Sequence, residues 1–189
     1  MKPAPANEPR GEEPSTTALV IAARSGDRVA MACFYARFAP LVHAVLLARV
    51  DHADADDLTQ EVFVRAFDRL EALQEPEAAG GWLAAIARHA AVTLARGRKP
   101  REDADPSAAG RARGESGPVA SAEASEALAA IRALPEAYRQ TLLLRLVEGL
   151  TGPEIAARTG MTHGSVRVHL HRGFALLRER LGMSAEESP

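Results

Sequence analysis

The chain has 189 residues, of which 47% are hydrophobic and 25% are charged, and its formal net charge is −2. This composition is typical of a globular protein and excludes an intrinsically disordered chain, and the length accommodates one ordinary domain or two small ones. Aromatic residues make up only 4% of the chain while alanine is abundant, so most apolar positions are expected to lie on helices. We predict an all-α fold.

Residues 1–15 are rich in proline and acidic residues, and we expect them to form a disordered tail. The apolar run near the N-terminus is too short for a signal peptide or a membrane span, so no membrane insertion is expected. The single cysteine, Cys33, cannot form an internal disulfide or a cysteine-based zinc site by itself. These features favour a cytoplasmic location.

Helical patterning fills residues 16–99, which we predict to form the first domain. Within it, residues 51–77 carry nine acids against two arginines. Asp57 is expected to cap a helix in this stretch, with Gln60 at its third position. The buried side of that helix is predicted to hold Leu58, Val62, Ala66, Leu70 and Leu73.

The opposite side of the same helix is predicted to present Asp57, Gln60, Glu61 and Val64. An apolar Val64 within an acidic face is unusual for a surface that meets only water, and it fits a docking site for a basic protein element. An ordinary acidic amphipathic helix is the alternative interpretation.

The segment 81–99 predicts a further helix with a basic outer side that could hold a nucleic acid backbone. Its inner side is predicted to hold Trp82, Ile86, Ala90, Thr93 and Leu94. Its outer side is predicted to hold Arg88, Val92, Ala95 and Lys99, with Arg96 and Arg98 nearby. Trp82 is interpreted as a core anchor rather than as a platform on which a base stacks.

Residues 100–122 have no apolar periodicity and are rich in proline, glycine, serine and charge, which predicts a flexible linker. Helical patterning returns over residues 123–183, the predicted second domain, and residues 184–189 are too polar to pack. The sequence therefore predicts two small helical domains joined by a linker.

Three helices are expected in the second domain. The first has Pro135 in its first turn and ends before Gly149. Its apolar side is predicted to hold Tyr138, Leu142, Leu143 and Leu146. Thr151 and Glu154 form a capping box for the second helix, and Gly160 permits the tight turn that ends it.

The third helix is predicted to start after Thr162 and to run to about Leu181. Val166, Leu170, Leu177 and Leu181 form its apolar stripe. The outer face is predicted to hold Gly164, Ser165, Val168, His171, Arg172 and Ala175, with Arg167 on its flank. Small residues allow close approach to a groove and arginine can pair with guanine, so the two helices predict a DNA-reading helix-turn-helix. A helical hairpin with a solvated arginine face is the alternative.

Neither a metal site nor an enzyme is expected. His169 and His171 point about 200° apart on a helix and cannot share a metal ion. The sequence has no nucleophile motif, paired-carboxylate pocket or glycine-rich phosphate loop, so no cofactor or catalytic residue is predicted.

The segments "DADDLTQEVFVRAF", "GGWLAAIARHAAVTLARGRK" and "GLTGPEIAARTGMTHGSVRVHLHRG" together resemble domains two and four of the sigma-70 family, in its extracytoplasmic-function form. The resemblance covers about residues 20–99 and 125–182. It implies a sigma factor that binds core RNA polymerase, through the β′ coiled coil and the β flap, and opens promoter DNA. It also implies control by an anti-sigma factor and an association with the nucleoid when the polymerase is bound.

The resemblance assigns roles to individual residues. Core binding would fall to Asp57, Gln60, Glu61 and Val64, and the minus-ten element to Arg88, His89, Arg96 and Lys99. The minus-thirty-five element would be read by Ser165, Arg167, Val168, His171 and Arg172, with Arg158 available for phosphate. His89, Thr93, Val168 and His169 depart from residues common in the family, which leaves the promoter sequence open. A self-contained, dimeric helix-turn-helix regulator is the alternative function.

Overall fold

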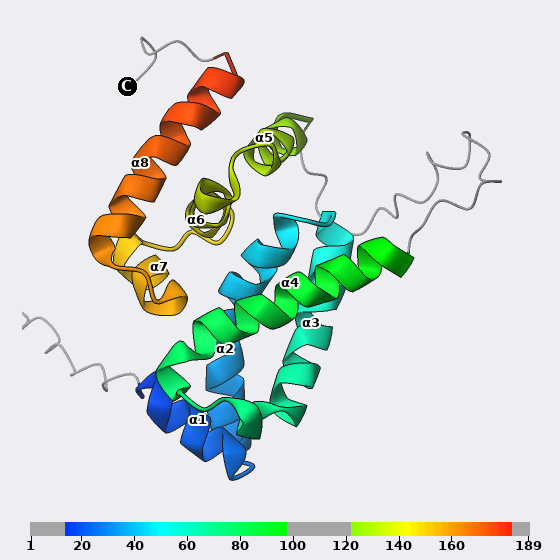
Figure 1. Cartoon of the computed structure of the whole chain (residues 1–189), viewed down its shortest axis with the longest axis vertical. Helices are drawn as coiled ribbons and strands as arrows, with labels where there is room; N and C mark the ends of the chain where they lie inside the picture. The colour runs from blue at the N-terminus through cyan, green and yellow to red at the C-terminus, as the bar shows by residue number, and fades with distance from the viewer. Residues whose placement is uncertain (1–13, 98–121, 183–189) are drawn as a thin grey trace, which may run out of the picture.

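The computed structural model describes residues 14–97 and 122–182, and within these two ranges it contains helices and no strand (Figure 1). The all-α prediction is therefore confirmed. The first range holds α1 (Thr16–Arg24), α2 (Arg28–Leu47), α3 (His52–Asp68), two short 3-10 helices (Leu70–Ala72 and Pro76–Ala78) and α4 (Ala79–Gly97). The second range holds α5 (Ala122–Arg132), α6 (Glu136–Leu146), α7 (Gly152–Thr159) and α8 (His163–Arg180). Most of the predicted tails and linker, and Lys99, lie outside the described residues.

Helix α2 forms the centre of the molecule and packs against α1, α3, α4, α6 and α7. It begins after Asp27, whose carboxylate accepts hydrogen bonds from the backbone N–H groups of Val29 (2.8 Å) and Ala30 (3.2 Å). Its 20 residues are apolar enough to cross a membrane by length and composition, but core helices of globular proteins meet the same test. Its contacts on several sides, and its fully buried residues such as Phe34 and Leu41, account for that composition.

Helix α3 begins earlier than the sequence predicted. Asp51 caps it by accepting a hydrogen bond from the N–H of Asp54 (3.0 Å), so Asp57 lies inside the helix and the prediction that it is the cap was wrong. An acid near a helix N-terminus is favoured by the helix dipole, which lets the acidic stretch join the helix. The predicted buried side is confirmed for Leu58, Val62 and Ala66. Leu70 and Leu73 are buried too, but they follow the end of α3 at Asp68 and do not belong to that helix.

The buried side of α4 is centred on smaller residues than predicted. Leu83, Ala87 and Ala90 are buried, while Trp82 and Ile86 are only partly covered. Thr93 is exposed, contrary to the prediction, and its hydroxyl donates to the backbone carbonyl of His89 (3.0 Å). This alanine-rich side lets α4 lie close against α2.

The ends of α7 and the start of α8 follow the sequence closely. The N–H and hydroxyl of Thr151 both donate to the Glu154 carboxylate, at 2.8 and 2.7 Å, and Gly160 has φ of +73°. Thr162 caps α8 by accepting from the N–H of Ser165 (3.1 Å). Gly173 of α8 is buried against α6. A Cβ on this residue would lie 3.0 Å from the side chain of Leu142, so glycine allows the two helices to pack closely here.

Helix α6 differs from the prediction at both ends. It begins at Glu136 with Pro135 as the N-cap, and it ends at Leu146. Leu146 is 49% exposed rather than buried, whereas Leu144, which the sequence analysis did not select, is fully buried. Helix α6 therefore packs on α2 with one side and on α8 with another.

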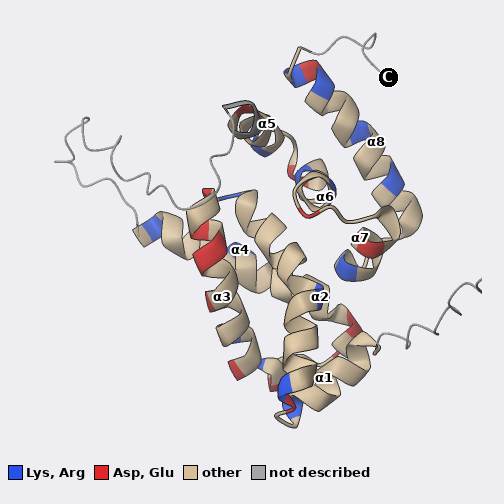
Figure 2. Ribbon diagram, turned by 180° about the vertical axis from the view of Figure 1, so that it is seen from behind, with Lys and Arg blue, Asp and Glu red and all other residues tan. Residues whose placement is uncertain are grey.

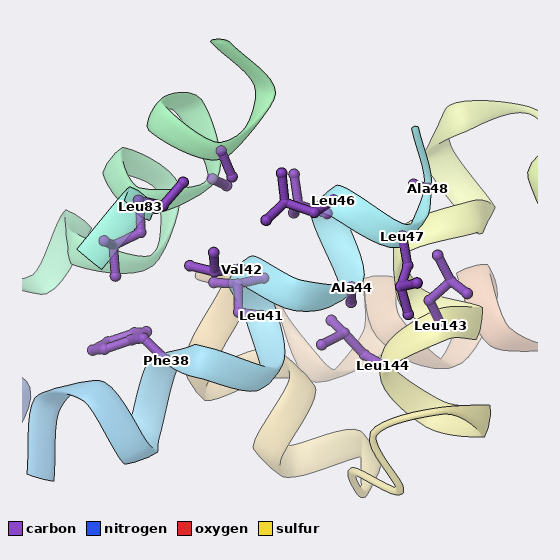
Figure 3. Close-up of a cluster of buried hydrophobic side chains, with 14 of the residues drawn as sticks. Phe38, Leu41, Val42, Ala44, Leu46, Leu47, Ala48, Leu83, Leu143 and Leu144 are labelled. Atoms are coloured by element: carbon purple, nitrogen blue, oxygen red, sulfur yellow. The ribbon is translucent and has the colours of Figure 1, made fainter. Parts of the chain in front are cut away.

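The two domains pack on one another. Figure 3 shows Leu143 and Leu144 of α6 beside Leu47 of α2, within a single cluster of buried side chains that reaches Leu83 of α4. Burying apolar side chains is the main favourable contribution to such packing, at about 25 cal/mol per Å² of apolar surface. The hydrophobic core is continuous between the domains in this arrangement.

Arginines of the second domain cap the end of α2. Arg132 donates to the backbone carbonyls of Leu47 (2.8 Å) and Val50 (2.5 Å), and Arg139 donates to that of Ala48 (3.2 Å). The last carbonyls of a helix have no partner within the helix, and its C-terminus favours cations. These contacts satisfy polar groups that would otherwise be left without partners at the domain interface.

Candidate functional site

The acidic face of α3 is formed by the four residues expected there. Asp57, Gln60, Glu61 and Val64 are all exposed, and Val64 is 62% exposed. Glu61 pairs with Arg65 one turn later, which holds its side chain along the helix. Acidic segments along α3 are visible in Figure 2. The face therefore offers negative charge around one exposed apolar side chain, which suits a basic partner surface.

A basic hollow lies between the end of α3 and α4. It has a volume of about 430 Å³, with Trp82 and Ile86 in its lining and Arg65, Arg69 and His89 around it. Trp82 is only partly buried, so it contributes to the core and also borders the hollow. A partly exposed indole beside cationic side chains has the chemistry that receives an unstacked base.

The outer face of α4 continues this basic surface. Arg88, His89 and Arg96 are exposed, as expected for residues that contact nucleic acid, and only His89 also lines the hollow. Arg88 and Arg96 therefore extend the positive surface along the helix, where phosphate oxygens could be held.

Helices α7 and α8 form the predicted hairpin, with a turn at Gly160. Arg167, Val168, His171 and Arg172 line one shallow hollow of about 410 Å³ on the outer face of α8. All four are exposed, and basic segments mark α8 in Figure 2. Ser165 is exposed too, with its hydroxyl 2.9 Å from that of Thr162.

The structure gives Arg158 a different environment from the one expected. Its guanidinium donates to the backbone carbonyl of Arg37 in α2 (2.8 Å) and lies 3.8 Å from Glu154, and its side chain is only 19% exposed. Arg158 is therefore not available for phosphate in this arrangement. The phosphate contact stays a prediction for a state in which the two domains have separated.

A histidine bridges the two domains. His43 of α2 lies 2.6 Å from Glu148, which follows α6, and 3.3 Å from Asp56 of α3. The hydrogen bond with Glu148 raises the pKa of His43 above its usual value, against the lowering effect of burial, and Asp56 adds to the rise. Glu148 thus joins the second domain to His43 of α2, which in turn lies beside Asp56 of α3.

Comparison with known proteins identifies a family for each domain. Residues 34–101 match the family described as Sigma-70 region 2, and residues 124–177 match Sigma-70, region 4. The sigma factor CarQ of Myxococcus xanthus is 34% identical over 168 residues, covering 84% of this chain and 93% of CarQ. The ECF sigma factor EcfG of Rhodopseudomonas palustris is 30% identical over 150 residues, covering 78% of this chain and 83% of EcfG.

The chain belongs to the extracytoplasmic-function sigma factors of the sigma-70 family. Members of this family are transcription initiation factors rather than enzymes. A third relative, the ECF sigma factor SigE of Mycolicibacterium smegmatis, is 34% identical over 141 residues, covering 71% of this sigma factor. The alignment spans only 54% of SigE, so this sigma factor matches about half the length of that relative.

A solved structure shares the fold of this sigma factor. It contains CnrH in complex with the cytosolic domain of CnrY, and it covers 88% of this chain and 97% of its own, with a TM-score of 0.54 and 24% identity. This likeness supports the helical fold with its two domains.

The contacts between the domains of this sigma factor are not predicted from its sequence. His43 lies within α2 and no local pattern marks it, whereas the spacing of His52 and Asp56, four residues apart on α3, indicates that these two side chains can meet. The role of Gly80 is not predicted either. A Cβ on Gly80 would lie 1.9 Å from the carbonyl oxygen of Arg158, so only glycine allows α4 and α7 to approach this closely.

Proposed function

We propose that this sigma factor binds core RNA polymerase and directs it to promoters, where it starts transcription by recognising and opening DNA. One observation carries the proposal. The chain presents an acidic docking face with Val64 on α3 in one domain and an exposed basic reading face on α8 in the other. A protein partner and a DNA site can therefore be held by separate surfaces of one chain.

The acidic face is proposed to dock on the polymerase. Asp57, Gln60, Glu61 and Val64 would contact the β′ coiled coil, and the second domain would contact the β flap. The exposed carboxylates would steer association with a basic surface, while Val64 would supply apolar contact at the centre.

The basic surfaces are proposed to hold the promoter. The hollow beside Trp82 would receive an unpaired base of the minus-ten element, and Arg88, His89, Arg96 and Lys99 would hold the backbone nearby. Arg167, Val168, His171 and Arg172 would read the minus-thirty-five element, with Ser165 beside them. Arg158 would contact phosphate once the two domains have separated. Capture of unpaired bases supplies the free energy for opening, so no ATP hydrolysis is required.

We further propose an anti-sigma factor as a regulatory partner, in the bacterial cytoplasm where sigma factors act on RNA polymerase. Exposed apolar residues on both domains support this, because Val64 of α3 and Val168 of α8 would be covered by a protein that masks the docking and reading faces. CnrH, which shares the fold, was solved in complex with the cytosolic domain of CnrY.

Gel filtration of the full chain with and without core polymerase tests the proposal. We expect a monomer that shifts into the polymerase peak. A stable dimer that ignores core polymerase would instead support a self-contained helix-turn-helix regulator, the alternative function.

A charge-reversal pair tests the docking face itself. Glu61→Lys should weaken core binding, because it places a cation in the acidic face. Glu75→Lys is the matched control, since Glu75 is an exposed glutamate of the same domain outside α3. Equal core affinities for the two variants, with unchanged circular dichroism, would refute the assignment of α3.

A further inference from the structure

Three side chains with metal-binding atoms gather between α2 and α3. The ligand atoms of His43, His52 and Asp56 all lie within 4.8 Å of one another. Nε2 of His43 is 3.3 Å from Oδ1 of Asp56, and Nδ1 of His52 is 3.1 Å from Oδ2 of Asp56. The two distances involve different oxygens of Asp56, so a carboxylate that binds through one oxygen needs a small side-chain rotation to bring both imidazole nitrogens to the roughly 3.3 Å that a tetrahedral ion with bonds of about 2.0–2.1 Å sets between its ligand atoms.

One atom of this cluster lacks a partner that a metal ion would supply. Nε2 of His43 is buried and has no hydrogen-bond partner among the described residues, while Oδ1 of Asp56 lies 3.3 Å away as an ion-pair partner. A buried polar atom without a partner is costly. His52 and Asp56 are 62% and 53% exposed, so an ion can reach the cluster from solvent and both side chains can adjust to it.

The other nitrogen of the same histidine is held by a carboxylate. Nδ1 of His43 lies 2.6 Å from Oε1 of Glu148, a distance that fits a strong hydrogen bond from Nδ1–H to the carboxylate. A proton on Nδ1 leaves the lone pair of Nε2 free for a metal ion. Metal-binding histidines usually donate their second N–H to such a group, which orients the ring and makes it a better ligand.

We propose that His43, His52 and Asp56 bind a divalent transition-metal ion of the Zn²⁺ class, with Glu148 as the residue that positions His43. Imidazole nitrogens with one carboxylate suit zinc and its neighbours, whereas calcium and magnesium prefer oxygen ligands alone. The three ligands leave a fourth position for water or for an incoming side chain.

The site would couple metal binding to the arrangement of the domains. Its ligands lie in the first domain, while Glu148 belongs to the second and contacts His43 only when the domains are packed together. If contact with Glu148 strengthens metal binding by some factor, the bound ion must favour the packed arrangement of the domains over the separated one by the same factor. Asp56 and Gln60 line one hollow, so the ion would also lie beside the proposed docking face.

The test is a titration of the full chain, freed of metal by a chelator, with Co²⁺ followed by visible absorption and then by Zn²⁺ competition. We expect one ion per chain, with the intense visible bands of a tetrahedral site. His52→Ala removes a ligand without touching Glu148, and it should weaken binding by at least about tenfold. His163→Ala is the matched control, because His163 is an exposed histidine at the start of α8, and it should bind as the wild type does.

Glu148→Gln tests the positioning role separately. It keeps the size of the side chain and should weaken metal binding by about 10–100-fold while leaving the stoichiometry at one. Absence of a stoichiometric Co²⁺ complex in the wild type would overturn the site. Equal affinities for His52→Ala and His163→Ala, with both variants folded by circular dichroism, would overturn it as well.

Discussion

The contact between Gly80 and Arg158 gives a sharp test of the interface between the domains. A Cβ on Gly80 would lie 1.9 Å from the carbonyl oxygen of Arg158 and 3.3 Å from Leu41. The obstacle is backbone, which cannot rotate away as a flexible side chain would. Helices α4 and α7 must therefore separate by about 1.5 Å before Gly80→Ala restores ordinary van der Waals contact.

The expected cost of Gly80→Ala falls on the interface and not on the first domain. Overpacking of this kind costs about 1–3 kcal/mol, which lowers the ratio of packed to separated domains by roughly 5- to 150-fold. Within α4 itself, alanine favours the helix over glycine by up to about 1 kcal/mol. The first domain should therefore stay folded while the second is released from it.

Small-angle X-ray scattering of the full chain measures the effect directly. Gly80→Ala should increase the radius of gyration and the maximum dimension relative to the wild type. Gly81→Ala is the matched control, because a Cβ on the next residue of the same helix meets nothing within 4 Å. Identical scattering from Gly80→Ala and Gly81→Ala, at equal helix content, would refute the close approach of α4 and α7.

Three further changes have defined outcomes. Arg172→Ala should relax base preference at one promoter position by about 1–3 kcal/mol, measured by selection from a randomised promoter pool, and an unchanged selected sequence would contradict its reading role. Thr151→Ala should lower the free energy of unfolding by about 0.5–2 kcal/mol in urea, because it removes one half of the capping box, and an unchanged midpoint would contradict the cap. The same cap has a pH dependence. Hydrogen bonds from Thr151 lower the pKa of Glu154 in the folded protein. The ionised Glu154 therefore contributes its full stabilisation above the pKa it has in the unfolded chain, and this stabilisation is lost as the pH falls through its pKa in the folded protein. Glu154→Gln should remove that acid-side slope in stability, and an identical slope in the variant would contradict the assignment.

Local signals in the sequence predicted much of the second domain. Thr151, Glu154, Gly160 and Thr162 act through hydrogen bonds and backbone angles within a few residues, so their roles follow from spacing alone. The exposed face of α8 follows from helical periodicity in the same way, because the side chains that remain after the apolar stripe is placed must face outward.

The start of α3 could not be fixed by such reasoning. Both Asp51 and Asp57 are followed by helix-forming residues, and either can accept a hydrogen bond from an N–H two or three residues later. The choice depends on where α2 ends and how the chain returns to pack on it, which is a property of the tertiary structure.

Arg158 and His43 show why the interface between the domains was not predictable. Arg158 lies 121 residues from Arg37, and His43 lies 105 residues from Glu148, so no local pattern relates the partners. In the sequence, an arginine on a helix looks the same whether its guanidinium contacts a phosphate or a backbone carbonyl of another segment. The environment of both residues is set by packing between segments far apart in the chain.

Run-off transcription with core RNA polymerase on a library of genomic fragments tests the central claim most directly. We expect transcripts that start at defined positions and require both core polymerase and this sigma factor. Their promoters should share one minus-ten and one minus-thirty-five sequence. A chain that binds core polymerase yet yields no transcript beyond those of core alone would contradict its assignment as an initiation factor.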